Sequence, residues 1–283
     1  MPSLTDVMTA DAASLAADAA AAQTAGGHAP APAQRGDLFE FLLRMGDSTL
    51  ILGHRVSEWC GHSPVLEEDI ALANVALDLI GQTQMWLGYA GEVEGAGRDA
   101  DALAFLRDAG AFRNALITER PNGDFGATLM RQFLFDAWHF LMLGALERSS
   151  DPRVAEIAAK AKKEVAYHLE RSRDLVIRLG DGTDESHARM QDALDDLWAY
   201  AGELFVPDSI DIAMAKAGVA PDPAELKQGW TKIVDETLTE ATLKKPASSF
   251  AQKGGKSGVH SEYLGHLLAQ MQFLQRAYPD ATW

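Results

Sequence analysis

The sequence contains a single cysteine, Cys60, among 283 residues. One thiol forms no internal disulfide and holds no iron–sulfur cluster, and its isolation favours a reducing compartment. We therefore expect a cytoplasmic protein. We also expect Cys60 to be a small buried hydrophobic residue and not a nucleophile, because buried, unreactive thiols are the commoner kind.

Basic residues are also scarce. The chain has 25 Lys and Arg against 41 Asp and Glu, which gives a formal net charge of −16. Nucleic acids and anionic membrane surfaces are bound through concentrated positive charge, which this sequence lacks. It also has no uninterrupted apolar run of about 18 residues, the length that spans a bilayer. The sequence therefore predicts neither a nucleic-acid partner nor a membrane partner.

The first 36 residues differ from the rest of the chain. They are rich in alanine, contain three aspartates, have no Lys or Arg before Arg35, and end with alternating Ala and Pro at 29–32. An export signal needs a basic start and a strongly apolar core, and a transit peptide needs arginines with few acids. We predict a disordered Ala/Pro-rich N-terminal tail over 1–36 and one folded helical domain over 37–283.

From Asp37 onward, apolar residues recur every three or four positions, as in helices that pack against a core. No alternating strand pattern or hairpin signal competes. Helices are predicted over about 37–59, 67–92, 101–113, 129–143, 152–180 and 184–204, with two shorter helices after Pro207 and a last one over 262–276. The core-facing stripe of the second helix is predicted to contain Ile70, Ala73, Leu77, Ile80, Gln84 and Leu87. The fold class is therefore all-α.

Four of these helices predict a four-helix bundle with additional C-terminal helices. The polar residues predicted to face its interior are Glu58, Asp78, Asp136 and His168. Di-iron carboxylate proteins place a Glu from each of two helices, and a Glu-x-x-His from each of the other two, at such a centre. Here both Glu-x-x-His elements are broken. Gly81 stands where the histidine of the second helix would be, and Val165 stands where the glutamate of the fourth would be.

The remaining polar residues favour a metal-free interior. Asp78 and Asp136 are each shorter than Glu by one C–C bond of ~1.5 Å, whereas metal–ligand distances are held to about 0.2 Å. An isolated buried carboxylate is costly, so we expect Asp136 to pair with His168. We interpret His139, three residues after Asp136, as a packed imidazole. One imidazole and three carboxylates still suffice for a single ion, so an autonomous iron oxidase with one or two metal ions and an iron-storage protein stay as alternatives.

Two further patterns indicate hydrogen-bonded networks. His54 and Arg55 precede Glu58 by four and three residues on the same helical face and are expected to neutralise it. A second pattern is the row formed by Asn74, Asp78 and Gln82. Because these three residues recur every four positions on an otherwise apolar helix, we interpret them as a polar seam between helices.

Several blocks of sequence, in the same order, resemble one family. The blocks are 57–62 (SEWCGH), 71–79 (ALANVALDL), 136–139 (DAWH), 163–168 (KEVAYH) and 254–272 (GGKSGVHSEYLGHLLAQMQ). The chain resembles the C subunit of the bacterial phenylacetyl-CoA epoxidase, a multicomponent oxygenase. The resemblance extends from about Leu38 to Trp283 and leaves out only the N-terminal tail.

The resemblance implies a ferritin-like subunit that is paralogous to the catalytic A subunit but has lost its di-iron site. The degenerate ligand positions are then Glu58, Asp78, Gly81, Asp136, Val165 and His168. Such a subunit has no catalytic residue and no cofactor, and it pairs with the di-iron A subunit and stabilises it among further epoxidase subunits. The complex consumes oxygen and NADPH, and its electrons come from a reductase that holds FAD and an iron–sulfur cluster.

The loop from Lys253 to Gly258 is the candidate site for an anion. Backbone amides of a Gly-rich turn, together with Lys253 and Lys256, suit a phosphate of coenzyme A at a subunit boundary. The spacing of a nucleotide-hydrolysing loop is absent, and no strand precedes the segment. Contact with a partner subunit is the preferred interpretation of the two lysines.

Overall fold

The computed structural model describes residues 32–248, 250–279 and 281. The predicted N-terminal tail falls largely on residues 1–31, which lie outside the described residues. Its last five residues were assigned wrongly, because helix α2 (Pro32–Ser57) begins at Pro32. Proline is well tolerated in the first turn of a helix, where its missing N–H has no partner to lose. The described residues from Arg35 onward form one compact unit, to which the packing described below belongs.

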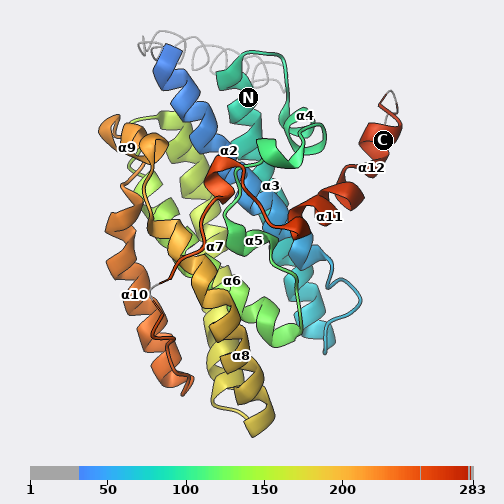
Figure 1. The fold of residues 1–283 in the computed structure, drawn as a ribbon, viewed down its shortest axis with the longest axis vertical. Coiled ribbons are helices and arrows are strands. Elements are labelled where there is room, and N and C mark those ends of the chain that lie inside the picture. Colours follow the sequence, from blue (N-terminus) through green and yellow to red (C-terminus); the bar gives the residue numbers. More distant parts are fainter. Residues whose placement is uncertain (1–31, 249, 280, 282–283) are drawn as a thin grey trace, which may run out of the picture. The chain divides into compact units, whose positions relative to one another are not determined.

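The described residues form helices and loops without a strand, so the all-α prediction is confirmed (Figure 1). After α2, the helices are α3 (Leu66–Glu94), α4 (Ala100–Phe105), α5 (Leu116–Glu119), α6 (Phe125–Leu146), α7 (Pro152–Gly180), α8 (Asp184–Ala201), α9 (Ser209–Lys216), α10 (Pro223–Glu240), α11 (Glu262–Met271) and α12 (Phe273–Ala277). Short 3-10 turns are η1 (Ala109–Ala111), η2 (Gly202–Phe205) and η3 (Gly255–Ser257).

Helix starts follow capping chemistry. The Asp124 carboxylate accepts a hydrogen bond from the amide of Ala127 at 2.9 Å and so begins α6. Asp151 accepts from the first-turn amides of α7, and Thr183 does the same for α8. Each cap satisfies an amide that has no partner within its own helix, which explains why the predicted starts of α7 and α8 are confirmed.

The predicted helix over 101–113 is wrong beyond Phe105. The backbone amide of Arg113 donates to the Asp47 side chain at 2.8 Å and not to a helical carbonyl. The chain therefore continues as the turn η1, an extended stretch and the short helix α5. The predicted last helix is likewise divided at Gln272 into α11 and α12.

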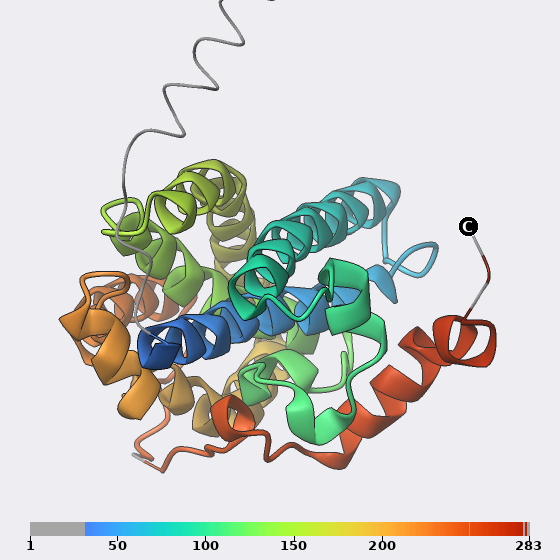
Figure 2. The same ribbon diagram turned by 90° about the horizontal axis from the view of Figure 1, so that it is seen from above.

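Two helices lie at the centre of the molecule. Every residue of α2 from Phe41 to Gly53 is buried, and so is every residue of α6 from Thr128 to His139. Helices α3 and α7 complete the bundle, and α8 and α10 cover α6 (Figure 2). A stripe of apolar residues predicts only one buried face, whereas these two segments are buried on all sides.

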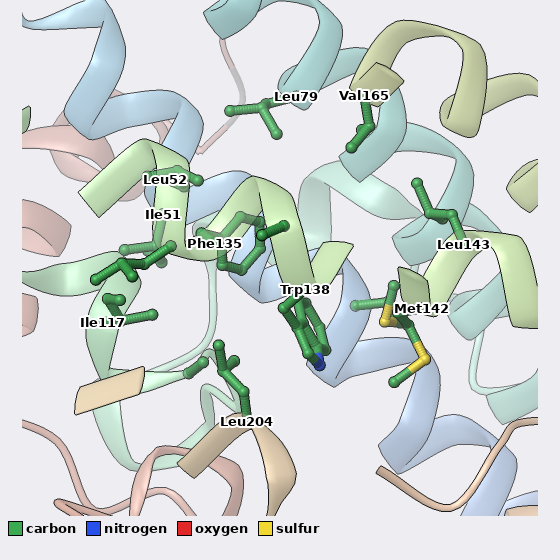
Figure 3. Packing of buried hydrophobic residues seen from close by; sticks show 14 of the residues in the cluster. Ile51, Leu52, Leu79, Ile117, Phe135, Trp138, Met142, Leu143, Val165 and Leu204 are labelled. Atoms are coloured by element: carbon green, nitrogen blue, oxygen red, sulfur yellow. The ribbon is translucent and has the colours of Figure 1, made fainter. Parts of the chain in front are cut away.

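The apolar core joins the four bundle helices. Figure 3 shows side chains from different helices that pack together, among them Ile51, Leu52, Leu79, Phe135, Leu143 and Val165. Each is nearly or fully buried. Full burial of a side chain of this size contributes roughly 1.5–3 kcal/mol, so this core accounts for much of the stability that holds the polar residues in place.

The core-facing stripe predicted for helix α3 is only partly right. Leu87 is fully buried and Ile80 packs against the core, as predicted, but Ile70 and Leu77 are exposed. The fully buried Leu72, Leu79 and Trp86 lie outside the predicted stripe. Apolar residues occur on both sides of this helix, so their spacing did not determine which side faces the core. Ile70 and Leu77 therefore lie on the surface of the described part of the fold.

Within the part of the chain that the structure describes, no helix is both long enough and apolar enough to span a membrane.

Candidate functional site

A polar cluster lies inside the bundle, where α6 meets α7. Asp136 of α6 is fully buried and accepts hydrogen bonds from Gln132 Nε2 at 2.7 Å and from Ser172 Oγ at 2.9 Å. Burial raises the pKa of Asp136 to about 6, although the charge of His168 and the two hydrogen bonds act in the opposite direction. Both oxygens of the carboxylate are therefore engaged by the protein itself.

The expected hydrogen-bonded pair of Asp136 and His168 is wrong. His168 Nε2 contacts Asp78 Oδ2 of α3 at 2.9 Å. Ser172, one helical turn further along α7, provides the hydrogen bond to Asp136 that we had assigned to His168. The side chain of Asp78 is 37% exposed, so this carboxylate lies at the rim between α3 and α7 and not in the interior.

His139 is a packed imidazole, as interpreted from the sequence. Its ring stacks on Trp138 and lies against Phe135, with centroid separations of 6.0 and 5.1 Å. Neither ring nitrogen forms a hydrogen bond with a described residue. Burial lowers the pKa of His139 to about 3, and the nearby charge of His168 lowers it further, so this ring is neutral at physiological pH.

Glu58 lies outside the bundle interior, contrary to prediction. Helix α2 ends at Ser57, and the side chain of Glu58 is 41% exposed. Its carboxylate accepts hydrogen bonds from Arg55 Nη1 at 3.0 Å and from Asn122 Nδ2 at 2.8 Å. The predicted neutralisation is thus confirmed for Arg55. It is not observed for His54, whose pKa is lowered by burial. Asn122 also accepts from the buried guanidinium of Arg131 at 2.6 Å, which connects this surface network to α6.

Gly81 and Val165 occupy the two positions where the sequence suggested lost metal ligands. Val165 is fully buried in the apolar core. Gly81 faces the other way, because no atom outside its own helix lies within 4 Å of the place that a Cβ would take. A side chain at position 81 would therefore point away from the bundle. A histidine at this position, as the Glu-x-x-His motif would have it, could not reach the interior.

A polar seam joins α3 to α7 along their length. It consists of contacts between Glu68 and Arg171, between Asp78 and His168, and between Gln82 and Glu164. The seam predicted from the sequence is confirmed for Asp78 and Gln82. It is wrong for Asn74, which is exposed.

The donor set does not fit a di-iron centre. Among the described residues, the polar cluster between α6 and α7 has one fully buried carboxylate, Asp136, and the imidazoles of His139 and His168, whereas two irons require several carboxylates that project inward from four helices. The other fully buried carboxylates, Asp47 and Glu119, are paired with Arg107 and His260 elsewhere in the fold. Both oxygens of Asp136 and the Nε2 atom of His168 are already bound within the chain. Among the described residues, no group of three or more His, Cys, Asp and Glu is placed to hold a metal ion.

We expect the purified chain to bind no stoichiometric iron, manganese or zinc, because its interior donors are too few and are already hydrogen-bonded. The measurement is elemental analysis after aerobic purification and after reconstitution with ferrous iron. A di-iron protein that is treated in parallel serves as the positive control. Two irons per chain held with submicromolar affinity would contradict this prediction and favour the autonomous oxidase.

The Gly-rich loop does hold an anion, but the anion belongs to this chain. Glu203 accepts hydrogen bonds from the amides of Gly254 at 2.6 Å and Gly255 at 2.9 Å. Lys256 Nζ contacts Asp211 Oδ2 at 2.5 Å. The coenzyme A interpretation is therefore wrong for these amides and for Lys256. Lys253 is exposed, and its contact with a partner subunit stays a prediction.

The expectation for Cys60 is also wrong. The residue lies in the turn that follows α2, and its side chain is exposed and free. The neighbouring apolar residue Trp59 is only partly buried. The end of α2 therefore leaves the core earlier than the apolar spacing indicated.

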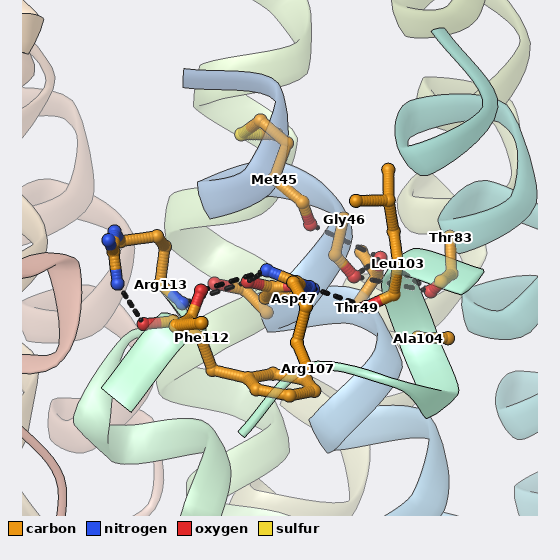
Figure 4. Close-up of polar contacts among 12 residues, drawn as sticks. Met45, Gly46, Asp47, Thr49, Thr83, Leu103, Ala104, Arg107, Phe112 and Arg113 are labelled. Atoms are coloured by element: carbon orange, nitrogen blue, oxygen red, sulfur yellow. Dashed lines mark hydrogen bonds and ion pairs between the residues drawn. The ribbon is translucent and has the colours of Figure 1, made fainter. Parts of the chain in front are cut away.

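The sequence did not point to a buried ion pair between α2 and the segment that follows α4. Both guanidinium NH2 groups of Arg107 donate to the carboxylate of Asp47, one of them at 3.0 Å (Figure 4). The two side chains are 4% and 0% exposed. The Arg107 guanidinium also lies over the ring of Phe112, 4.4 Å from its centroid. The pair joins residues 60 positions apart and fixes this segment to the central helix.

A second buried pair holds the C-terminal segment. His260 Nδ1 contacts Glu119 Oε2 at 2.9 Å, and His260 Nε2 contacts the carbonyl oxygen of Phe112 at 3.0 Å. Both partners are acceptors, so both ring nitrogens carry a proton and the imidazole is cationic. Burial alone would lower the pKa of His260, but the hydrogen bonds to Glu119 and Phe112 outweigh it and raise this pKa.

Two comparisons with known proteins indicate the same family. The family model described as phenylacetic acid catabolic protein matches residues 20–283. The chain is also 48% identical over 246 residues to the C subunit of 1,2-phenylacetyl-CoA epoxidase from Escherichia coli (strain K12). That alignment covers 87% of this chain and 99% of the relative.

Proposed function

Because the chain belongs to the phenylacetic acid catabolic protein family, we propose that it is the non-catalytic C subunit of a phenylacetyl-CoA epoxidase. Its relative in Escherichia coli has that subunit name. In this proposal the chain is a ferritin-like scaffold that pairs with the catalytic A subunit and stabilises it in a cytoplasmic complex for phenylacetate degradation.

One observation carries the non-catalytic assignment. The six positions where the sequence suggested former metal ligands do not converge on one point. Asp136, Val165 and His168 are interior, whereas Glu58 is exposed, Asp78 lies at the rim and Gly81 faces outward. A catalytic di-iron centre needs all of its ligands in one small volume, and this bundle does not supply them.

The chemistry is then divided among the subunits. The A subunit would supply the di-iron centre, and a reductase would supply electrons from NADPH through FAD and an iron–sulfur cluster. This chain would contribute a rigid bundle with a well-packed core and no group that touches the substrate. Its effect on the reaction would come from the assembly that it maintains, since an interface alone is enough to make a subunit essential to an enzyme.

We expect the substitution Glu58→Gln to leave epoxidation by the reconstituted complex within about threefold of wild type, a barrier change below ~0.7 kcal/mol. Glu58 is an exposed carboxylate whose two oxygens accept separately from Arg55 and Asn122, and a glutamine of the same size retains one of these two acceptors. The measurement is product formation from phenylacetyl-CoA, oxygen and NADPH.

Assembly of the Glu58→Gln complex is checked by size-exclusion chromatography, so that a loss of association is not mistaken for a loss of chemistry. A thousandfold loss of activity in an intact complex would show that a working active site lies within this chain. In that case the scaffold proposal is wrong.

A further inference from the structure

A small cavity lies inside the fold, between α2, α6 and the turn η3. Its volume is about 40 Å³. One water molecule needs roughly 10–15 Å³ of such space, so the cavity has room for a molecule of about three atoms besides hydrogen. Every residue that lines it is buried except Arg113 and Lys256, which are partly exposed. The cavity is therefore enclosed by the core on most of its sides.

The floor of the cavity is apolar. Phe41 and Met45 lie one turn apart on α2. Trp138 and Met142 have the same spacing on α6 and are drawn side by side in Figure 3, so each pair lies on one face of its helix. Leu204 of η2 closes the floor. These five side chains are at most 7% exposed, and a molecule in the cavity meets hydrocarbon, aromatic rings and thioethers.

The charged side chains that line the cavity already have partners within the chain. Arg44 and Lys256 both pair with Asp211, at 3.0 and 2.5 Å. Arg113 pairs with a carboxylate of α2 at 2.7 Å. Glu203 accepts hydrogen bonds from backbone amides, as described above. Because these charges are satisfied, the cavity does not call for an ion, and a neutral molecule suits it better.

Two N–H groups on the lining residues have no acceptor among the described residues. They are Nε1 of Trp138 and Nε of Arg44, and both atoms are buried. Each can only donate, so the two groups disfavour a cation and favour a molecule that has lone pairs. Water has lone pairs, but a buried water usually forms about three hydrogen bonds. The carboxylates around this cavity are already engaged, so water is poorly satisfied there.

The cavity comes close to solvent at one point. Glu203 and Lys256 line it, and the same two residues line an open cleft of about 380 Å³ on the outer surface. Their side chains therefore form the wall between the cavity and the cleft. The turn η3, which carries Lys256, is flanked by Gly254 and Gly258 with φ angles of +144° and +79°, a backbone that glycine adopts readily. A small molecule thus has a short route from solvent into the cavity.

We propose that this cavity binds dioxygen, which is held there unchanged and without a chemical reaction. Dioxygen has two atoms, no charge, low polarity and lone pairs at both ends, so it matches the volume, the apolar floor and the two N–H groups. Binding is weak and rapidly reversible, because van der Waals contacts supply most of the attraction. The inference goes beyond the proposed function, since it is drawn from the cavity of this chain and requires no partner subunit.

The test uses the paramagnetism of dioxygen, which speeds the relaxation of nearby methyl groups. The full chain is labelled with carbon-13 in its methionine methyl groups, and their NMR relaxation is measured under nitrogen and under oxygen pressure. The increase at Met45 and Met142 should be at least about threefold larger than at Met130 and Met190, which are also buried but lie where close packing leaves no room for dioxygen. Single Met→Leu changes assign the signals.

Two changes alter the cavity itself. Leu204→Phe fills it and should remove the excess relaxation at Met45 and Met142, whereas Leu204→Ala enlarges it and should keep the excess. Ala115→Val fills the cavity from another lining residue and replaces Leu204→Phe if that variant fails to fold.

Three results would overturn the assignment. Equal relaxation at all four methionines would show that dioxygen does not enter the cavity. Magnetisation transfer from water to the methyl groups of Met45 and Met142, without an oxygen effect, would identify water as the occupant. An oxygen effect that persists unchanged in a folded variant with a filled cavity would place dioxygen elsewhere in the molecule.

Discussion

Replacing Arg107 with Ala should lower the free energy of unfolding by about 3–5 kcal/mol, because it leaves a buried carboxylate without its cation. Asp47 is fully buried, and besides Arg107 it has a hydrogen bond from the Arg113 amide. Arg107 also donates to the carbonyl oxygens of Leu103 and Ala111, so its loss frees the segment between α4 and α5. The measurement is urea-induced unfolding followed by circular dichroism.

Two further variants test the cause. Arg178→Ala removes an exposed pair with Asp174 on α7 and should cost less than about 1 kcal/mol. The double change of Asp47→Asn with Arg107→Met should cost less than the sum of the single changes, because neither charge is then left unpaired. A loss of under 1 kcal/mol in Arg107→Ala would show that the pair does not stabilise the fold.

Replacing His260 with Ala should destabilise the protein most at mildly acidic pH. The pKa of His260 is raised, so its contribution is complete below its ordinary value of 6.5 and is lost as the pH rises through the higher folded value. The pKa of Glu119 is lowered, because its hydrogen bonds together outweigh the effect of burial. The Glu119 contribution is complete above 4.5 and is lost as the pH falls through the lower folded value.

The pair is therefore strongest between about pH 4.5 and 6.5. At pH 5.5, His260→Ala should cost about 3 kcal/mol, because it strands the buried Glu119. The cost should decrease as the pH rises well above 6.5. Urea unfolding from pH 5 to 9, with hydrogen exchange of α11, measures both effects. His266→Ala, at an exposed histidine of the same helix, is the control and should show no such trend. A cost that is independent of pH would mean that His260 is neutral in the folded chain.

The sequence predicted the helices well where local chemistry decides. Asp151 with Pro152 and Thr183 with Ser186 mark helix starts through side chains a few residues away, and both starts are confirmed. The buried pairs left no such signal. Asp47 and Arg107 are 60 positions apart, and Glu119 and His260 are 141 apart, so only the folded chain brings them together.

The candidate site was predicted less well than the fold. The apolar spacing of α3 is equally compatible with either face, and the side that carries Ile70 and Leu77 turned out to be exposed. A Gly-rich turn correctly indicated an anion-binding loop, but the anion is Glu203, 51 positions earlier in the chain. The glycines and lysines of the loop thus indicated that it contacts an anion, whereas the packing of distant segments determined that this anion is Glu203.

The outward direction of Gly81 has a consequence for protein engineering. The change that the degenerate motif suggests, Gly81→His with Val165→Glu, would put the new imidazole on the outer surface of the bundle and the new carboxylate in its apolar core. The two would not share a metal ion. An effort to rebuild an oxygen-activating centre would have to begin from α3 positions whose side chains are buried, such as Leu79 and Gln82. It would also have to release Asp136 from Gln132 and Ser172 before that carboxylate became a ligand.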